Sequence, residues 1–160
     1  MGKTVGVVPT QEVIDGNMSE TEEKSSQRIP VMSSNLRLSG DGTEGVLLGA
    51  VCKSCGEYFF GSPDFCLNCT SSELGEVELS RQGILRTYTV IWVPPPGWQG
   101  AVPYILGSVE LPEGPEVVSE VVDCPQEAIS IGMPMELTLR VGGTDKKGNE
   151  IVVYKWRPAS

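Results

Sequence analysis

The sequence contains no histidine, and among its 160 residues the 12 Lys and Arg are outnumbered by 21 Asp and Glu, giving a formal net charge of −9. The absence of histidine excludes Ser-His-Asp and Cys-His catalytic groups and every His-ligated metal site. Catalysis by this chain alone would have to use carboxylates, Lys, Tyr or Cys. The acidic balance argues against non-specific binding to nucleic acid or to anionic membranes, but it leaves room for a local basic pocket.

Long apolar runs are also missing. No run approaches 18 apolar residues, so we expect no transmembrane helix. Residues 1–10 have one Lys and no apolar core of a secretory signal, which predicts a cytoplasmic, reducing location. Aromatic residues make up 6% of the chain, whereas 19 Gly and 12 Pro favour turns and loops over long helices. Together with the strand patterns described below, this composition predicts a mostly β protein.

Residues 1–45 differ from the rest of the chain. The stretch 15–27 is polar and acidic, with Met18 as its only apolar residue, and short apolar patches flank it. Such a stretch cannot bury enough surface to offset the entropy of ordering it. We predict a flexible arm, or an arm that orders by docking on a partner; self-association remains open.

Four of the five cysteines form two Cys-x-x-Cys pairs, Cys52 with Cys55 and Cys66 with Cys69. Each pair lets two thiolates face one ion from a tight turn, and two pairs complete a tetrahedral site. Zinc is the favoured ion; iron, as in rubredoxin, and two disulfides are the alternatives. Four thiolates leave zinc no open position, so the predicted site is structural rather than catalytic.

The residues around the cysteines predict a zinc ribbon or rubredoxin-like hairpin over residues 46–74. Gly56 follows the first pair, where the chain needs a positive φ, whereas Thr70 at the equivalent place makes the second knuckle less standard. The fifth cysteine, Cys124, has no histidine to act as its base. We interpret Cys124 as a half-buried residue at the end of a strand.

Residues 75–160 read as all-β. Apolar alternation and turn signals predict five strands, a first one broken near residues 82–83 and four more at 104–111, 116–122, 135–141 and 150–156. Residues 125–129 could form a single helical turn after the third strand. This order is typical of a five-stranded OB-fold barrel, and a β-sandwich fragment is the competing architecture.

The ordered set of motifs resembles one protein family over roughly residues 46–158. The motifs are 49–56, 59–60, 66–69, 83–90, 103–104, 109–111, 131–137 and 154–158. Together they resemble the acyl-CoA-associated OB-fold proteins with a rubredoxin-like zinc ribbon. Many of those proteins enter the ribbon from an amphipathic helical pair, whereas here the Gly-rich stretch 40–45 precedes it. The arm 1–45 is therefore a candidate replacement for that docking element.

The resemblance implies a partner protein rather than a free enzyme. We expect a non-catalytic, zinc-binding subunit of a thiolase-type acyl-CoA acyltransferase complex, packed beside a thiolase-fold catalytic subunit and helping to shape the CoA site. Two further alternatives are a partner of an acyl-CoA hydratase or of a hydroxymethylglutaryl-CoA synthase-type condensing enzyme. An OB-fold binder of single-stranded nucleic acid and a rubredoxin-like electron carrier are less compatible with the charge and composition.

Contacts to a CoA thioester would need cations for its phosphates and an aromatic face for its adenine. Trp98 lies in a Pro-rich loop at the place where OB-folds usually meet ligands. The candidate CoA contacts are Trp98, Arg81, Arg86 and Lys155. The competing interpretation of each cation is an ordinary solvated charge.

Overall fold

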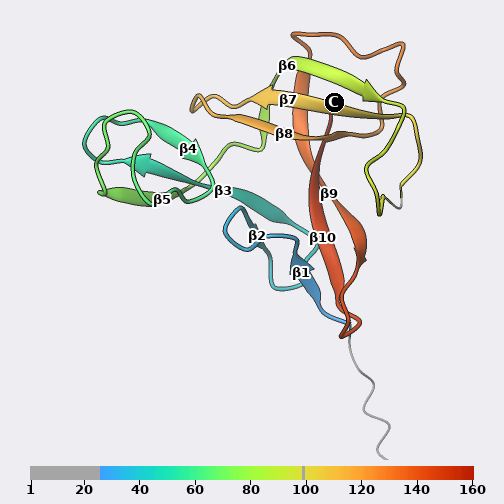
Figure 1. The fold of residues 1–160 in the computed structure, drawn as a ribbon, viewed down its shortest axis with the longest axis horizontal. Helices are drawn as coiled ribbons and strands as arrows, with labels where there is room; N and C mark the ends of the chain where they lie inside the picture. Colours follow the sequence, from blue (N-terminus) through green and yellow to red (C-terminus); the bar gives the residue numbers. More distant parts are fainter. Residues whose placement is uncertain (1–25, 99) are drawn as a thin grey trace, which may run out of the picture.

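The computed structural model describes residues 26–98 and 100–160, and the regular secondary structure of this part is entirely β-strand (Figure 1). The strands are β1 (Arg28–Pro30), β2 (Leu36–Leu38), β3 (Gly45–Cys52), β4 (Tyr58–Phe60), β5 (Leu74–Glu78), β6 (Gln82–Ile91), β7 (Tyr104–Glu110), β8 (Glu116–Val121), β9 (Pro134–Thr144) and β10 (Glu150–Pro158). The predicted mostly β class is confirmed. Among these residues, no helix has the length and apolar character needed to cross a bilayer.

Strands β6 to β10 form a closed five-stranded barrel. The neighbours run β10-β8-β7-β6-β9, and the pairing of β9 with β10 closes the ring. The OB-fold expected from the sequence is therefore confirmed. The β9–β10 hairpin is long, and its far end extends below the barrel in Figure 1, where β1 pairs in parallel with the start of β10.

A second, four-stranded sheet holds the cysteine region. Strand β3 pairs with β2 through its first residues, and its second half lies between β4 and β5. Gly49 sits in this central stretch, where a Cβ atom would lie 2.4 Å from the carbonyl oxygen of Phe59. Only glycine allows β4 to approach β3 this closely. All five residues of β5, Leu74 to Glu78, pair with β3, so this sheet extends to Glu78.

The segment 1–45 is described only from residue 26. Its acidic stretch up to residue 25 lies outside the described residues. The remainder contributes β1 to the edge of the barrel sheet and β2 to the edge of the four-stranded sheet. Arg28 at the start of β1 also forms an ion pair of 2.8 Å with Glu150 of β10.

The two sheets share one hydrophobic core. Leu36 and Leu47 of the four-stranded sheet are fully buried in the same cluster as Leu85 and Trp156 of the barrel. The Trp156 indole N–H donates a hydrogen bond of 3.1 Å to the carbonyl oxygen of Val117. The metal-ligand region is thus anchored to the barrel by packing, in addition to the covalent connection.

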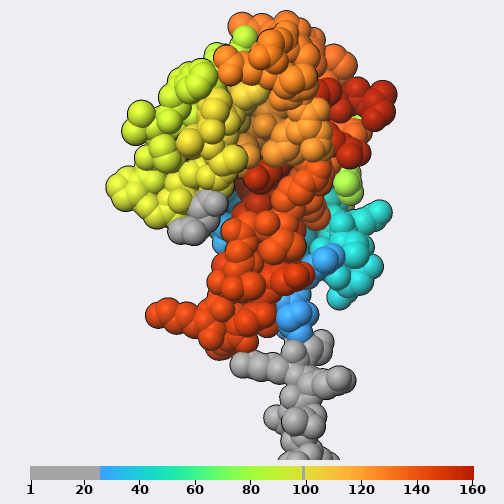
Figure 2. All heavy atoms as spheres, turned by 90° about the vertical axis from the view of Figure 1, so that its right-hand side faces the viewer, coloured from blue at the N-terminus to red at the C-terminus, as the bar shows by residue number. Residues whose placement is uncertain are grey.

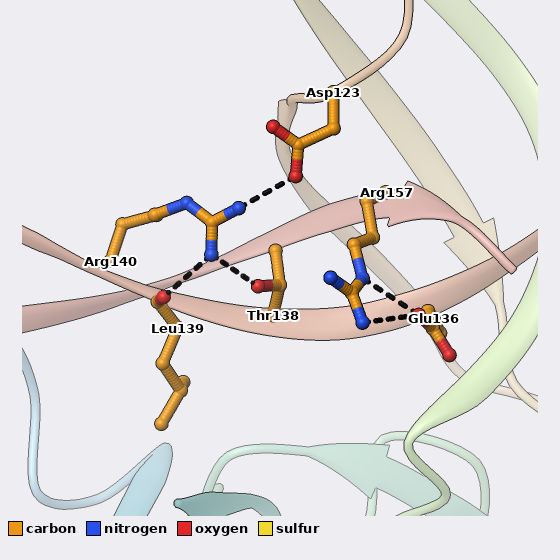
Figure 3. A network of polar contacts seen from close by, with 6 residues as sticks. All are labelled: Asp123, Glu136, Thr138, Leu139, Arg140 and Arg157. Atoms are coloured by element: carbon orange, nitrogen blue, oxygen red, sulfur yellow. Dashed lines mark hydrogen bonds and ion pairs between the residues drawn. The ribbon is translucent and has the colours of Figure 1, made fainter. Parts of the chain in front are cut away.

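Two arginines link β9 to neighbouring segments through hydrogen bonds and ion pairs (Figure 3). Arg140 donates 2.6 Å hydrogen bonds to Asp123, just after β8, and to Thr138 on its own strand. Arg157 of β10 pairs with Glu136 of β9 at 2.6 Å. The segment 125–129, for which the sequence allows a single helical turn, is instead a turn with a 2.9 Å hydrogen bond from the Ala128 N–H to the oxygen of Pro125.

Candidate metal centre and ligand cleft

The sulfur atoms of the four paired cysteines lie within 4.8 Å of one another. The distance between sulfurs is 3.6 Å for Cys52 and Cys69, and 3.5 Å for Cys55 and Cys66. A disulfide bond is about 2.05 Å long, whereas thiolates about 2.3 Å from one tetrahedral ion are separated by about 3.8 Å. The geometry is that of ligands converging on a single metal ion.

The two cysteine knuckles have the same backbone geometry. The N–H of Gly56 donates to the oxygen of Cys52 at 2.8 Å, and the N–H of Thr70 donates to the oxygen of Cys66 at 2.9 Å. Both residues adopt a positive φ, 79° at Gly56 and 63° at Thr70. This conformation is uncommon for a β-branched residue. The second knuckle therefore closes like the first although threonine replaces glycine, and the Thr70 hydroxyl donates to the Cys69 oxygen at 2.7 Å.

The electrostatics of the cluster favour a bound cation. The backbone N–H of Cys55 is the largest influence that lowers the pKa of Cys52, to about 6. The N–H of Ser71 lowers the pKa of Cys69, but hydrogen bonding with Cys55, desolvation and the sulfurs of Cys52 and Cys66 outweigh it and raise the pKa to about 12. Four sulfurs this close cannot all ionise without a compensating positive charge. A divalent ion supplies that charge.

The donor set fits a soft transition metal. Besides the four sulfurs, the N–H of Cys69 lies 3.4 Å from the sulfur of Cys66, and the Asn68 amide lies 3.7 Å from the sulfur of Cys55. Such N–H groups around thiolates orient them and reduce their charge. Four thiolates suit zinc and also iron, so the residues present can hold a metal ion of this class.

Two of the four candidate CoA contacts, Trp98 and Lys155, line one cleft of about 620 Å³ on the barrel. The Trp98 ring stacks on Tyr104, with centroids 4.1 Å apart and an interplanar angle of 16°. The Lys155 amine forms an ion pair of 2.5 Å with Glu120, and both side chains are 21% exposed. The cleft thus combines an aromatic wall with a lysine whose charge is already neutralised by a carboxylate.

The other two candidates, Arg81 and Arg86, do not line this cleft. Arg86 donates two hydrogen bonds to Glu110, at 2.5 and 2.8 Å, which hold the pKa of that carboxyl below its ordinary value. Arg81 forms no ion pair within the part of the chain that the structure describes. The sequence did not indicate Tyr104 or Glu120 as cleft residues, because only the pairing of β7 with β8 brings their strands together.

The comparisons with known proteins agree with this architecture. Residues 76–140 match the family described as "ChsH2, C-terminal OB-fold domain". A "DUF35 domain-containing scaffold protein" of Methanocaldococcus jannaschii is 35% identical over 114 residues, which cover 70% of this chain and 81% of that protein. The chain belongs to the DUF35 family. The family resemblance identified in the sequence is therefore confirmed.

Two further relatives of this DUF35 chain carry names that describe complexes. A "Benzoylsuccinyl-CoA thiolase subunit BbsA" of Geobacter metallireducens is 32% identical over 123 residues, covering 76% of this chain and 81% of that protein. The solved structure of an "Ltp2-ChsH2(DUF35) aldolase" aligns with a TM-score of 0.60 and 28% identity, over 72% of this chain and 86% of the other.

Proposed function

We propose that this DUF35 chain is the non-catalytic, zinc-binding subunit of a thiolase-type acyl-CoA acyltransferase complex. The observation that carries the proposal is the similarity, over most of both chains, to a protein named as a subunit of a CoA-thioester thiolase. The aldolase neighbour, whose title joins a DUF35 domain to a second component, supports the same arrangement.

The metal in this proposal is zinc, held by Cys52, Cys55, Cys66 and Cys69 in a closed four-thiolate site. Zinc in such a site has no open coordination position and therefore stabilises the fold rather than activating water or substrate. Cys52 ends β3, Cys55 lies in the turn between β3 and β4, and Cys66 and Cys69 lie in the loop between β4 and β5. The ion would hold the β3–β4 turn and the β4–β5 loop together.

The proposed separation of roles between the two subunits follows from the catalytic groups that this chain lacks. Thiolase-type acyl transfer needs a nucleophilic cysteine with a base to activate it. The chain has no histidine, and the cysteine outside the cluster, Cys124, is half-buried with its pKa raised by desolvation. A thiol with a raised pKa forms little of the reactive thiolate at neutral pH. In our proposal, the reacting cysteine and its base belong to the partner subunit.

The contribution of this chain to CoA binding is assigned to the barrel. We propose that the cleft with Trp98 and Lys155 faces the CoA thioester, and that Arg81 and Arg86 are the candidate cations for its phosphates. Arg81 is the more available of the two, since it forms no ion pair among the described residues, whereas Arg86 is engaged by Glu110. Because one relative is named after benzoylsuccinyl-CoA, we propose that thioester, from anaerobic aromatic degradation, as the first substrate to test.

The complex can be tested by co-expressing the chain with the thiolase-type protein encoded in the same genome. We expect the two proteins to elute together from a size-exclusion column in a fixed ratio. An acyl-CoA hydratase from that genome is the matched control and should elute separately. Co-elution with the hydratase alone would contradict the thiolase assignment and favour the hydratase alternative.

A further inference from the structure

The β6–β7 region is free of charge over an unusual length. No charged residue occurs from position 87 to position 109, between Arg86 and Glu110, in a chain that is 21% charged. Burial in the barrel explains this for β7, whose residues are mostly buried. It does not explain it for the connection between β6 and β7, which is largely exposed.

Large apolar side chains project into solvent at the base of this connection. Trp92 is 64% exposed, Val93 is 84% exposed and Val102 is 47% exposed. These three residues are called the charge-free patch below. Ile91 pairs with Tyr104, so the two ends of the loop, which carry these residues, lie side by side. The loop hangs from the end of the barrel away from the four-stranded sheet (Figure 1), and its yellow-green atoms form an outer edge of the molecule in Figure 2.

Two features restrict the conformation of the described part of the loop. Three consecutive prolines, 94–96, restrict the backbone directly after Val93. Trp98 folds back onto Tyr104 and donates a hydrogen bond of 3.4 Å to the oxygen of Ala101. A preorganised apolar surface loses little entropy on binding, which is a property of efficient interaction sites.

We propose that the charge-free patch is the surface on which the catalytic subunit of the acyl-CoA complex docks. This inference rests on the proposed function, which supplies the partner. Depletion of charge with an exposed tryptophan is the composition of the centre of a protein–protein interface. Nucleic acid and anionic membranes would require cations, and this region has none. The complementary surface of the partner is an uncharged, apolar depression that accepts Trp92 and Val93.

The proposal is tested with Val93→Glu, which places one carboxylate in the patch. Isothermal titration against the thiolase-type catalytic chain should show the dissociation constant rising at least about 30-fold, because the substitution leaves an unpaired charge buried in an apolar contact. Val118→Glu is the matched control, since Val118 is 60% exposed on β8 and the chemical change is identical. We expect it to bind like the wild type. Metal content and melting temperature, compared for all three proteins, verify the fold.

The other outcomes each contradict a different statement. Equal binding by wild type and Val93→Glu would show that the charge-free patch is not the docking surface and would leave the proposed function intact. A wild-type chain that binds no catalytic chain would refute the proposed function, and the patch with it. A wild-type dimer that Val93→Glu dissociates in sedimentation experiments would assign the patch to a second copy. Binding to phosphatidylcholine vesicles that is lost in Val93→Glu would assign it to a membrane; either result overturns the proposal.

Discussion

Replacing Cys66 by serine should release the metal and strongly destabilise the protein. Cys66 is fully buried, and its sulfur lies 3.5 Å from that of Cys55. Serine removes one of four thiolates, and the remaining three leave the ion an open position and a weaker site. Structural zinc contributes about 10–16 kcal/mol of binding free energy to small zinc domains, so its loss is comparable with the whole stability of a domain.

The effect of Cys66→Ser should extend beyond the metal loop, because the four-stranded sheet contributes Leu36 and Leu47 to the core shared with the barrel. Elemental analysis should show the metal content falling from about one ion per chain to nearly none, with a lower melting temperature. Cys124→Ser is the matched control, since Cys124 lies outside the cluster. Full metal content and an unchanged melting temperature in Cys66→Ser would refute the four-thiolate site.

Replacing Trp156 by alanine should cost about 3–5 kcal/mol of unfolding free energy, the range for large aromatic residues in a core. Trp156 is fully buried and lies where the barrel closes, opposite Leu137 of β9 and Val121 of β8. The substitution opens a cavity at this seam. It also leaves the carbonyl oxygen of Val117 without its 3.1 Å hydrogen bond from the indole.

Trp156→Phe separates the two contributions, because phenylalanine keeps most of the apolar volume and lacks the N–H donor. We expect urea denaturation to place its midpoint between those of wild type and Trp156→Ala. Metal content should be unchanged in both variants, since Trp156 belongs to the hydrophobic core cluster and the four ligand cysteines lie outside it. An alanine variant that unfolds at the wild-type urea concentration would show that this seam does not hold the barrel closed.

Features governed by local spacing were predictable from the sequence. Within each Cys-x-x-Cys turn the two sulfurs are brought together by the short spacing alone. The approach of one pair to the other depends on the fold. The five barrel strands were recognisable from apolar alternation and turns. Thr70 in the left-handed region was the exception, because local propensity disfavours it and the knuckle geometry imposes it.

Features governed by non-local pairing were not predictable in the same way. Strands β1 and β2 have three residues each, too few for a periodic signal, and β1 finds its partner more than one hundred positions along the chain. The ion pairs that engage Arg86 and Lys155 depend on strand register in the barrel, which single-sequence patterns do not specify. For that reason, two candidate CoA-binding cations proved to be paired with carboxylates.

The central claim is that this DUF35 chain supports acyl-CoA chemistry performed by another subunit. The most direct measurement adds increasing amounts of the chain to a fixed amount of the thiolase-type catalytic chain and follows CoA-dependent cleavage of benzoylsuccinyl-CoA. The account predicts no turnover by this chain alone, and a rate that rises to a plateau at a fixed subunit ratio. Turnover by this chain alone, or a catalytic rate indifferent to its addition, would contradict the account.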